Sequence, residues 1–157
     1  MEVLRGFAPE LLHRALTDWH WVPGLAGKIP MVTSAFGDVF LEDQDGVWFL
    51  DTIEGVLTRE WDSPQALQAQ LSTPEGQDRF LLTGLAGAAF ERGLVPSDAQ
   101  ILFFKIPPIL GGTFEPENLE VTDLVVALSI AGQLHRQVKD LPPGTPISGF
   151  TFEQEAP

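Results

Sequence analysis

The dipeptide Asp45-Gly46 constrains the fold of this chain more than any other feature, because it lies between two short runs in which apolar and polar residues alternate. Alternation with a period of two is typical of a strand with one buried face, and Asp-Gly is a strong signal for a tight hairpin turn. We therefore predict strands over residues 37–42 and 47–52, joined by this turn. A further strand over residues 55–60 would extend the pair into an antiparallel meander.

Outside this meander the sequence changes between helical and extended patterns. Apolar residues recur at helical spacing over residues 8–21, from Ser63 through Leu71, and over residues 74–92 and 122–139, which predicts four helices. The apolar run at residues 101–106 predicts a buried strand, and residues 146–152 are expected to add a last one. These elements indicate a single α+β domain over residues 1–157, with a helix and lead-in at residues 1–30. Its central antiparallel sheet would have helices packed largely on one face.

The charge of the chain bears on its partners. Among 157 residues, 22 Asp and Glu outnumber nine Lys and Arg, and the net charge is −13. Phosphate binding requires cations, so direct binding to DNA or RNA is not expected. A basic protein partner would suit this charge, and an acidic surface that serves solubility alone explains it equally well. Because cysteine, a signal-peptide pattern and long apolar runs are missing, we expect a cytoplasmic protein without membrane spans.

No catalytic or metal-binding motif stands out in the sequence. His13 and His20 are seven residues apart, which places them two helical turns from each other, too far to chelate one ion. The pair Gly111-Gly112 lacks the lysine and the spacing of a phosphate-binding loop. We therefore predict no catalytic residue, no metal site and no cofactor, and we expect that the protein is not an enzyme.

Two acidic loops and one tryptophan are the candidates for contacts with a protein partner. Trp61, between Glu60 and Asp62, would be an exposed aromatic anchor of the kind that protein interfaces favour, whereas the other tryptophans are expected in the core. The acidic candidates are Glu42, Asp43 and Asp45 at the hairpin tip, and Glu115, Glu117 and Asn118 in the loop after Gly112. Asn118 would alternatively cap the following helix.

A second interpretation places a small-ligand pocket between the sheet and the last helix. Gln133 and His135 lie near the apolar face of that helix, where a polar group must find hydrogen-bond partners, and a minority of such groups line pockets. The glycines after Leu110 form either a tight bend or part of a binding loop. The residues predicted to line this pocket are Trp48, Phe104, Gly111, Gly112, Gln133 and His135.

Several stretches, in order, resemble one bacterial family. They are residues 35–40 (AFGDVF), 49–52 (FLDT), 105–112 (KIPPILGG), 117–118 (EN) and 132–138 (GQLHRQV). The pattern spans residues 30–147 and resembles the C-terminal domain of Tdi-type immunity proteins of the type VI secretion system. A GAD-like domain often precedes this domain in the family. Here about thirty residues precede the match, so the chain looks like a short, stand-alone member.

The resemblance implies an α+β fold and tight binding to a secreted DNase toxin, which the immunity protein blocks in the cytoplasm of the producing cell. The first hypothesis is therefore an immunity-type protein that binds a basic, DNase-type toxin and occludes or distorts its active site. A small-ligand sensor or regulatory domain is the alternative hypothesis. An enzyme is the third, because no residue pattern nominates a catalytic group.

Overall fold

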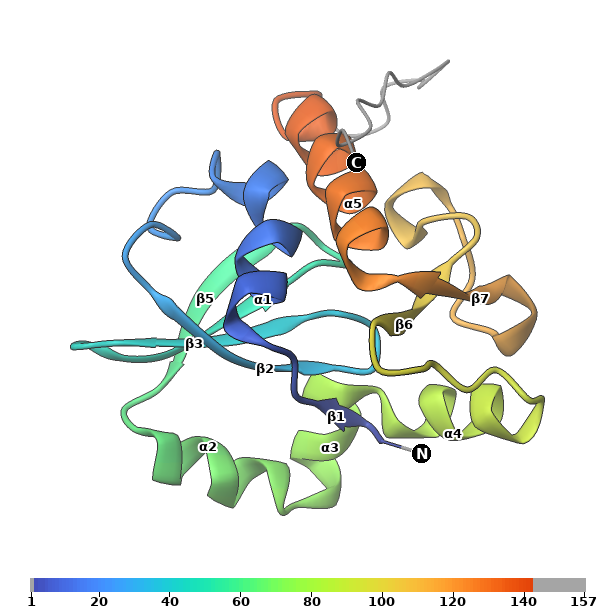
Figure 1. The fold of residues 1–157 in the computed structure, drawn as a ribbon, viewed down its shortest axis with the longest axis horizontal. Coiled ribbons are helices and arrows are strands. Elements are labelled where there is room, and N and C mark those ends of the chain that lie inside the picture. The colour runs from blue at the N-terminus through green and yellow to red at the C-terminus, as the bar shows by residue number, and fades with distance from the viewer. Residues whose placement is uncertain (1, 143–157) are drawn as a thin grey trace.

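The computed structural model describes residues 2–142 and contains a five-stranded antiparallel sheet (Figure 1). Its strands follow chain order as β1 (Leu4–Arg5), β2 (Ile29–Ser34), β3 (Val39–Asp43), β4 (Gly46–Asp51) and β5 (Val56–Trp61). Asp43 pairs with Gly46 across the turn, which confirms the predicted hairpin, and β5 continues the meander as expected. Since sequential neighbours pair throughout, β1 and β5 form the two edges of this sheet.

The second sheet has two strands, of which the sequence predicted the first alone. Strand β6 (Gln100–Phe104) pairs with β7 (Leu119–Asp123), and α5 (Leu124–Val138) begins directly after β7. The predicted helix over residues 122–139 therefore starts two residues later, and the strand before it went unrecognised. The strand predicted over residues 146–152 lies outside the described residues.

The other helices are shorter than their patterns suggested. Helix α1 (Pro9–Ala15) gives way to a 3-10 turn at Thr17–Trp19, and α2 (Pro64–Leu71) is capped by the Ser63 hydroxyl as its sequence indicates. The predicted helix over residues 74–92 is divided into α3 (Pro74–Leu81) and α4 (Thr83–Glu91). The division falls at Leu82, whose φ of 48° is left-handed and interrupts the helical backbone.

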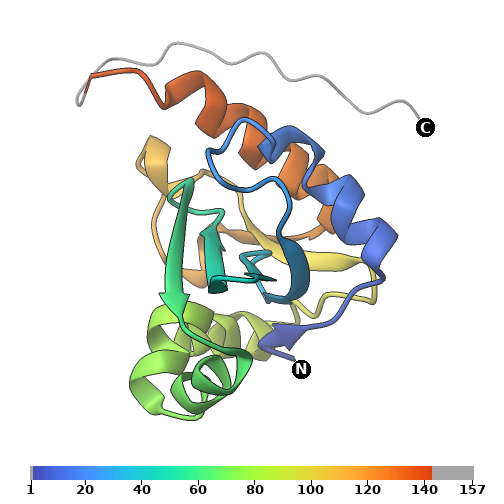
Figure 2. The same ribbon diagram turned by 90° about the vertical axis from the view of Figure 1, so that its left-hand side faces the viewer.

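Helices cover both faces of the five-stranded sheet (Figures 1 and 2). On one face, α1 and α5 pack with Val39, Leu41 and Leu50, and on the other α2 and α3 pack with Phe40 and Phe49. A third cluster joins α4 to the small sheet. The predicted α+β class with a central antiparallel sheet is confirmed, but the expectation that the helices lie largely on one face is not met. The apolar residues of β3 and β4 point to both sides, so both sides require cover.

The segment that follows α1 packs closely against α5. The indole nitrogen of Trp19 donates a hydrogen bond to the carbonyl of Leu128 at 2.8 Å, and that of Trp21 donates to the carbonyl of Gly132 at 3.1 Å. A Cβ at Gly132 would lie 2.6 Å from the carbonyl oxygen of Asp18, so a glycine is required at this approach. Within residues 2–142, no helix has the length and apolar composition needed to cross a bilayer.

Candidate functional site

A buried polar network joins the turn before β3 to the turn after β4. The carboxylate of Asp38 accepts hydrogen bonds from the Ser34 hydroxyl at 2.8 Å, the Thr52 backbone N–H at 2.9 Å and the Thr52 hydroxyl at 3.0 Å. Burial, and after it the nearby carboxyl of Asp51, raise the pKa of Asp38, these hydrogen bonds oppose the rise, and the net change is from 3.8 to about 7. Asp38 is thus a structural acid that fastens two turns together.

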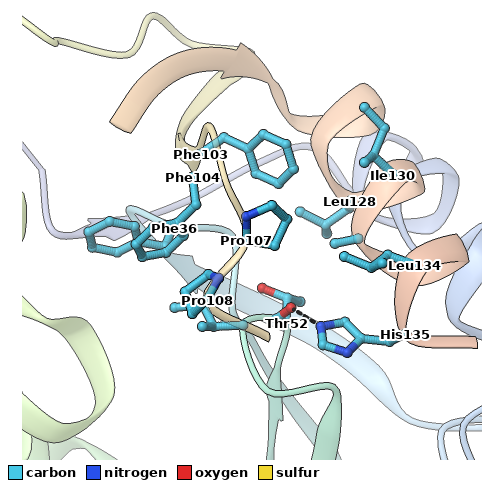
Figure 3. A pocket seen from close by; sticks show the side chains of 12 residues that line it. Phe36, Thr52, Phe103, Phe104, Pro107, Pro108, Leu128, Ile130, Leu134 and His135 are labelled. Carbon is cyan, nitrogen blue, oxygen red and sulfur yellow. Dashed lines mark hydrogen bonds between the residues drawn. The ribbon is translucent and has the colours of Figure 1, made fainter. Parts of the chain in front are cut away.

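His135 extends this network to the last helix. Its Nε2 lies 3.1 Å from the Thr52 carbonyl oxygen, and since a carbonyl only accepts, Nε2 carries the proton (Figure 3). The ring packs 5.6 Å from that of Trp19, and a Cβ at Gly55 would lie 2.5 Å from Nδ1. Burial lowers the pKa of His135, so the neutral imidazole is favoured as a link between α5 and the β4–β5 turn.

A small cavity lies beside this network, between α5 and the segment that follows β6 (Figure 3). Its volume is about 30 Å³, which is enough to hold a water molecule. Pockets for drug-sized ligands are typically about 300–1,000 Å³. The lining residues are Phe36, Thr52, Ile53, Phe103, Phe104, Pro107, Pro108, Leu128, Ile130, Ala131, Leu134 and His135.

This cavity includes two of the six residues predicted for a ligand pocket, Phe104 and His135. Gln133 points elsewhere and donates a hydrogen bond to the Ser129 hydroxyl at 3.0 Å. Trp48 lies at the hairpin tip, and the glycine pair lies in the loop after the cavity-lining prolines; none of the three lines the cavity. The predicted pocket is therefore wrong in most of its members, although its position between sheet and last helix is close to that of the observed space.

The hairpin tip uses its acidic residue Asp43 internally. The Asp43 carboxylate accepts hydrogen bonds from the Trp48 indole at 3.0 Å and the Asp45 N–H at 2.9 Å, and it pairs with the Lys28 ammonium at 3.2 Å. Lys28 also lies 3.9 Å from the centre of the Trp48 ring. Although desolvation raises the pKa of Asp43, the hydrogen bonds from Trp48 and Asp45 and the pairing with Lys28 leave it below its ordinary value. Of the predicted acidic contacts here, Asp45 is exposed and Glu42 is half-buried.

Asn118 organises the loop of residues 105–118, which connects β6 to β7. Its side-chain oxygen accepts from the Ile106 N–H at 2.9 Å, and its side-chain nitrogen donates to the carbonyls of Ile106 at 2.8 Å and Thr113 at 2.9 Å. A Cβ at Gly112 would collide with the Ile106 carbonyl, so the bend there requires glycine. Asn118 is buried and serves neither as an exposed contact nor as a helix cap, which corrects both expectations.

The outer surface of this loop is apolar at three positions. Ile106, Ile109 and Phe114 are 55%, 40% and 49% exposed. Isoleucine and phenylalanine are more often buried in folded proteins. Glu115 is exposed beside them, and Glu117 forms an ion pair with Arg92 of the segment after α4. The loop thus presents apolar side chains and a carboxylate on a backbone held by its own hydrogen bonds.

Trp61 is buried, contrary to prediction. Only 5% of it is exposed, its ring packs against those of Phe40 and Phe80, and its indole nitrogen donates to the Gln70 side chain at 2.7 Å. Glu60 and Asp62 suggested a loop, but Trp61 ends strand β5, where the sheet face is covered by α2 and α3. An exposed aromatic anchor therefore does not exist at this position.

A groove beside β5 is the surface that sequence reasoning missed. It encloses about 390 Å³ and opens to solvent, with the aromatic rings of Phe49 and Phe80 in its lining. The other lining residues are Asp51, Glu54, Val56, Thr58, Glu60 and Arg79. The spacing of two between residues 56, 58 and 60 was the available signal, because alternate residues of a strand share a face; Glu54 joins them from the turn before β5. Among residues 2–142, no three His, Asp or Glu side chains are grouped so that they could hold a metal ion.

Comparisons with known proteins establish the fold alone. No family model matches the chain, and no curated protein matches it. Among solved structures, the chain is similar to the crystal structure of Atu4351 from Agrobacterium tumefaciens, with a TM-score of 0.55 and 18% sequence identity. The match covers 83% of this chain and 66% of that one, so this chain corresponds to just under two thirds of that protein. The similarity supports the α+β architecture described above.

Proposed function

We propose that this protein is an immunity-type binding protein that neutralises a secreted nuclease toxin by direct protein–protein contact. The observation that carries this proposal is the loop of residues 105–118, which displays exposed Ile106, Ile109 and Phe114 on a backbone cross-linked by Asn118. Protein interfaces are commonly built around such apolar anchors within a polar rim. A loop that is rigid before binding loses less conformational entropy when the complex forms.

The net charge of −13 supports a basic partner. Opposite net charges accelerate association and disfavour partners of like charge. A protein that cleaves nucleic acid must itself bind phosphate, so cations near its active site would complement this surface. The resemblance to Tdi-type immunity proteins agrees with the same partner class.

The geometry favours binding over catalysis. The groups with shifted pKa values that are most enclosed, Asp38 and His135, are 3% and 4% exposed, and both hold backbone or hydroxyl groups of Thr52. A catalytic group must instead reach a substrate. The small-ligand alternative is less favoured, because the space beside Thr52 is about 30 Å³, far below that of pockets for drug-sized ligands.

The test is to retain partners of the tagged protein from a lysate of its own cells at physiological salt, and to identify them by mass spectrometry. A retained basic protein would then be assayed for cleavage of plasmid DNA, with increasing amounts of the immunity-type protein added. We expect stoichiometric inhibition by the wild type and at least about tenfold weaker inhibition by Phe114→Asp, since hot-spot losses commonly exceed 1.4 kcal/mol.

Ile29→Asp is the matched control, because Ile29 is 63% exposed but lies at the start of β2, outside the loop. It should inhibit like the wild type. If Ile29→Asp loses inhibition while Phe114→Asp keeps it, the contact surface is not the loop. If no retained protein cleaves nucleic acid, the proposed function is wrong.

A further inference from the structure

Strand β5 is an edge strand with one side of its backbone unpaired among residues 2–142. It pairs with β4 over residues 56–61 and is the last strand in the order of the sheet. No hydrogen bond from its backbone to a segment other than β4 exists within the described part of the chain. An open edge can accept a further strand from another protein, and native proteins usually block edges that have no such role.

The groove beside β5 has an aromatic floor and acidic walls. The rings of Phe49 and Phe80 pack edge to face, with their centres 5.2 Å apart. Because alternate residues of a strand share a face, Val56, Thr58 and Glu60 line one wall of the groove. Val56 is 49% exposed and offers an apolar contact at the start of this wall.

The charges of the groove define what would fit in it. It is lined by three carboxylates, of Asp51, Glu54 and Glu60, and by one cation, Arg79. Arg79 lies 3.6 Å from Glu60 and 4.7 Å from the centre of the Phe80 ring, yet its side chain is 66% exposed. The groove therefore already holds one guanidinium between a carboxylate and an aromatic face, which is the geometry that favours arginine. Asp51 already accepts hydrogen bonds from the N–H groups of Ile53 and Glu54. That leaves Glu54 and, through exchange with the exposed Arg79, Glu60 for the cations of a partner.

We propose that β5 and this groove bind an extended, arginine-rich segment of the partner protein, which pairs with β5 as a sixth strand. Alternate arginines of that segment would lie against Glu54 and Glu60, and the side chains between them would point to the other face of the sheet. The proposal deepens the proposed function, because the segment would belong to the neutralised toxin. Its test uses a synthetic peptide instead of the toxin, so the two proposals can fail separately.

The probe is a peptide of alternating arginine and valine, titrated calorimetrically into the full-length protein at physiological salt. We expect measurable binding that weakens at least about tenfold in the double variant Glu54→Gln, Glu60→Gln, since contacts between charges at an interface commonly amount to 1.4 kcal/mol or more. The matched control is Glu10→Gln, Glu91→Gln, which removes the same charge from two exposed sites outside the groove. It should change the affinity by less than about twofold, the size expected for screened distant charges.

A second peptide, N-methylated at alternate residues, tests the pairing of backbones. Methylation removes the N–H donors on one edge while keeping the charge, so we expect it to abolish binding. Equal weakening by both double variants would mean that net charge alone attracts the peptide, and the inference would be overturned. Undiminished binding of the methylated peptide would overturn the strand addition.

Discussion

The loop of residues 105–118 and strand β5 are both surface regions, but they orient their polar groups in opposite ways. In the loop, the amide of Asn118 faces inward and holds three backbone groups, while Ile109 and Phe114 face solvent. Beside β5, Phe49 is buried and the carboxylates of Glu54 and Glu60 border an open groove. The polar side chain of Asn118 therefore supports the fold of the loop, whereas the carboxylates of Glu54 and Glu60 are available to bind a partner.

This contrast predicts that substitutions of the inward-facing Gly112 and Asn118 of the loop change stability, whereas substitutions of the carboxylates beside β5 leave stability nearly unchanged. Between the two regions lies the network of Asp38, Thr52 and His135, which precedes β5 in the chain and borders the prolines of the loop at the cavity. Its substitutions are expected to have intermediate effects on stability.

The largest loss of stability is expected for Gly112→Ala. The added methyl group would collide with the Ile106 carbonyl, and backbone cannot yield as a flexible side chain does. We expect the free energy of unfolding, measured by urea denaturation, to fall by about 3 kcal/mol. The control is Gly111→Ala, where φ is 94° but space is open. That variant should lose about 1 kcal/mol through backbone strain alone. Equal losses in the two variants would mean that the close approach of residue 112 to the Ile106 carbonyl does not contribute to stability.

Asn118→Ala should follow, with a loss of about 2–3 kcal/mol, because three backbone groups would lose their side-chain partner. Asn118→Asp keeps the acceptor for the Ile106 N–H but loses both donors, so its loss should be of similar size. Glu115→Ala, in the same loop but exposed, should stay within about 0.5 kcal/mol. If Asn118→Ala were equally neutral, the loop would not depend on its internal hydrogen bonds.

Asp38 predicts a pH dependence whose sign can be worked out. Its pKa is raised from 3.8 to about 7 in the folded state, so the folded protein binds the proton more tightly than the unfolded chain. Its stabilising contribution is fully present below 3.8 and is lost as the pH rises through 7. His135 acts in the opposite sense, because its lowered pKa reduces stability as the pH falls below 6.5.

The contribution of Asp38 is isolated by comparing the wild type with Asp38→Asn at pH 5 and pH 8. We expect the stability of the wild type relative to the variant to fall by about 1–3 kcal/mol between these two values. Thermal denaturation monitored by circular dichroism would give both curves. A difference that stays constant with pH would mean that Asp38 has the same pKa in the folded and unfolded states.

The smallest effect on stability is expected for Glu54→Gln and Thr58→Ala beside β5, where both residues are exposed. Each should stay within about 0.5 kcal/mol of the wild type in urea denaturation. If the free energy of unfolding fell by more than about 1 kcal/mol, these side chains would support the fold as Asn118 does, and the contrast between the two regions would not hold.

The sequence was sufficient for features that depend on near neighbours. The hairpin around Asp45-Gly46 and the cap at Ser63 follow from turn and capping chemistry within a few residues. Strand β7 was missed because it passes into α5 without a turn, so the change of period from two to 3.6 has no boundary residue to mark it.

Features that depend on distant partners could not be predicted. Trp61 has charged neighbours in sequence, and its burial depends on α2 and α3, which pack over it. Asp38 meets Thr52 from 14 residues away and His135 meets Thr52 from 83 residues away, separations at which periodicity carries no information. The groove required the positions of β5 and α3 together, although the two-residue spacing along β5 was visible. Membership in the Tdi-type family stays a prediction.

The indole contacts between the N-terminal segment and α5 have a consequence for synthesis of the chain. The hydrogen bond from Trp19 cannot form until Leu128, 109 residues later, has been synthesised. At a translation rate of about 5–20 residues per second, this interval lasts roughly 5–20 seconds. During that time the apolar side of the first helix, with Leu12 and Leu16, has no α5 to cover it. We therefore expect this apolar side to be open to chaperones until α5 has been synthesised.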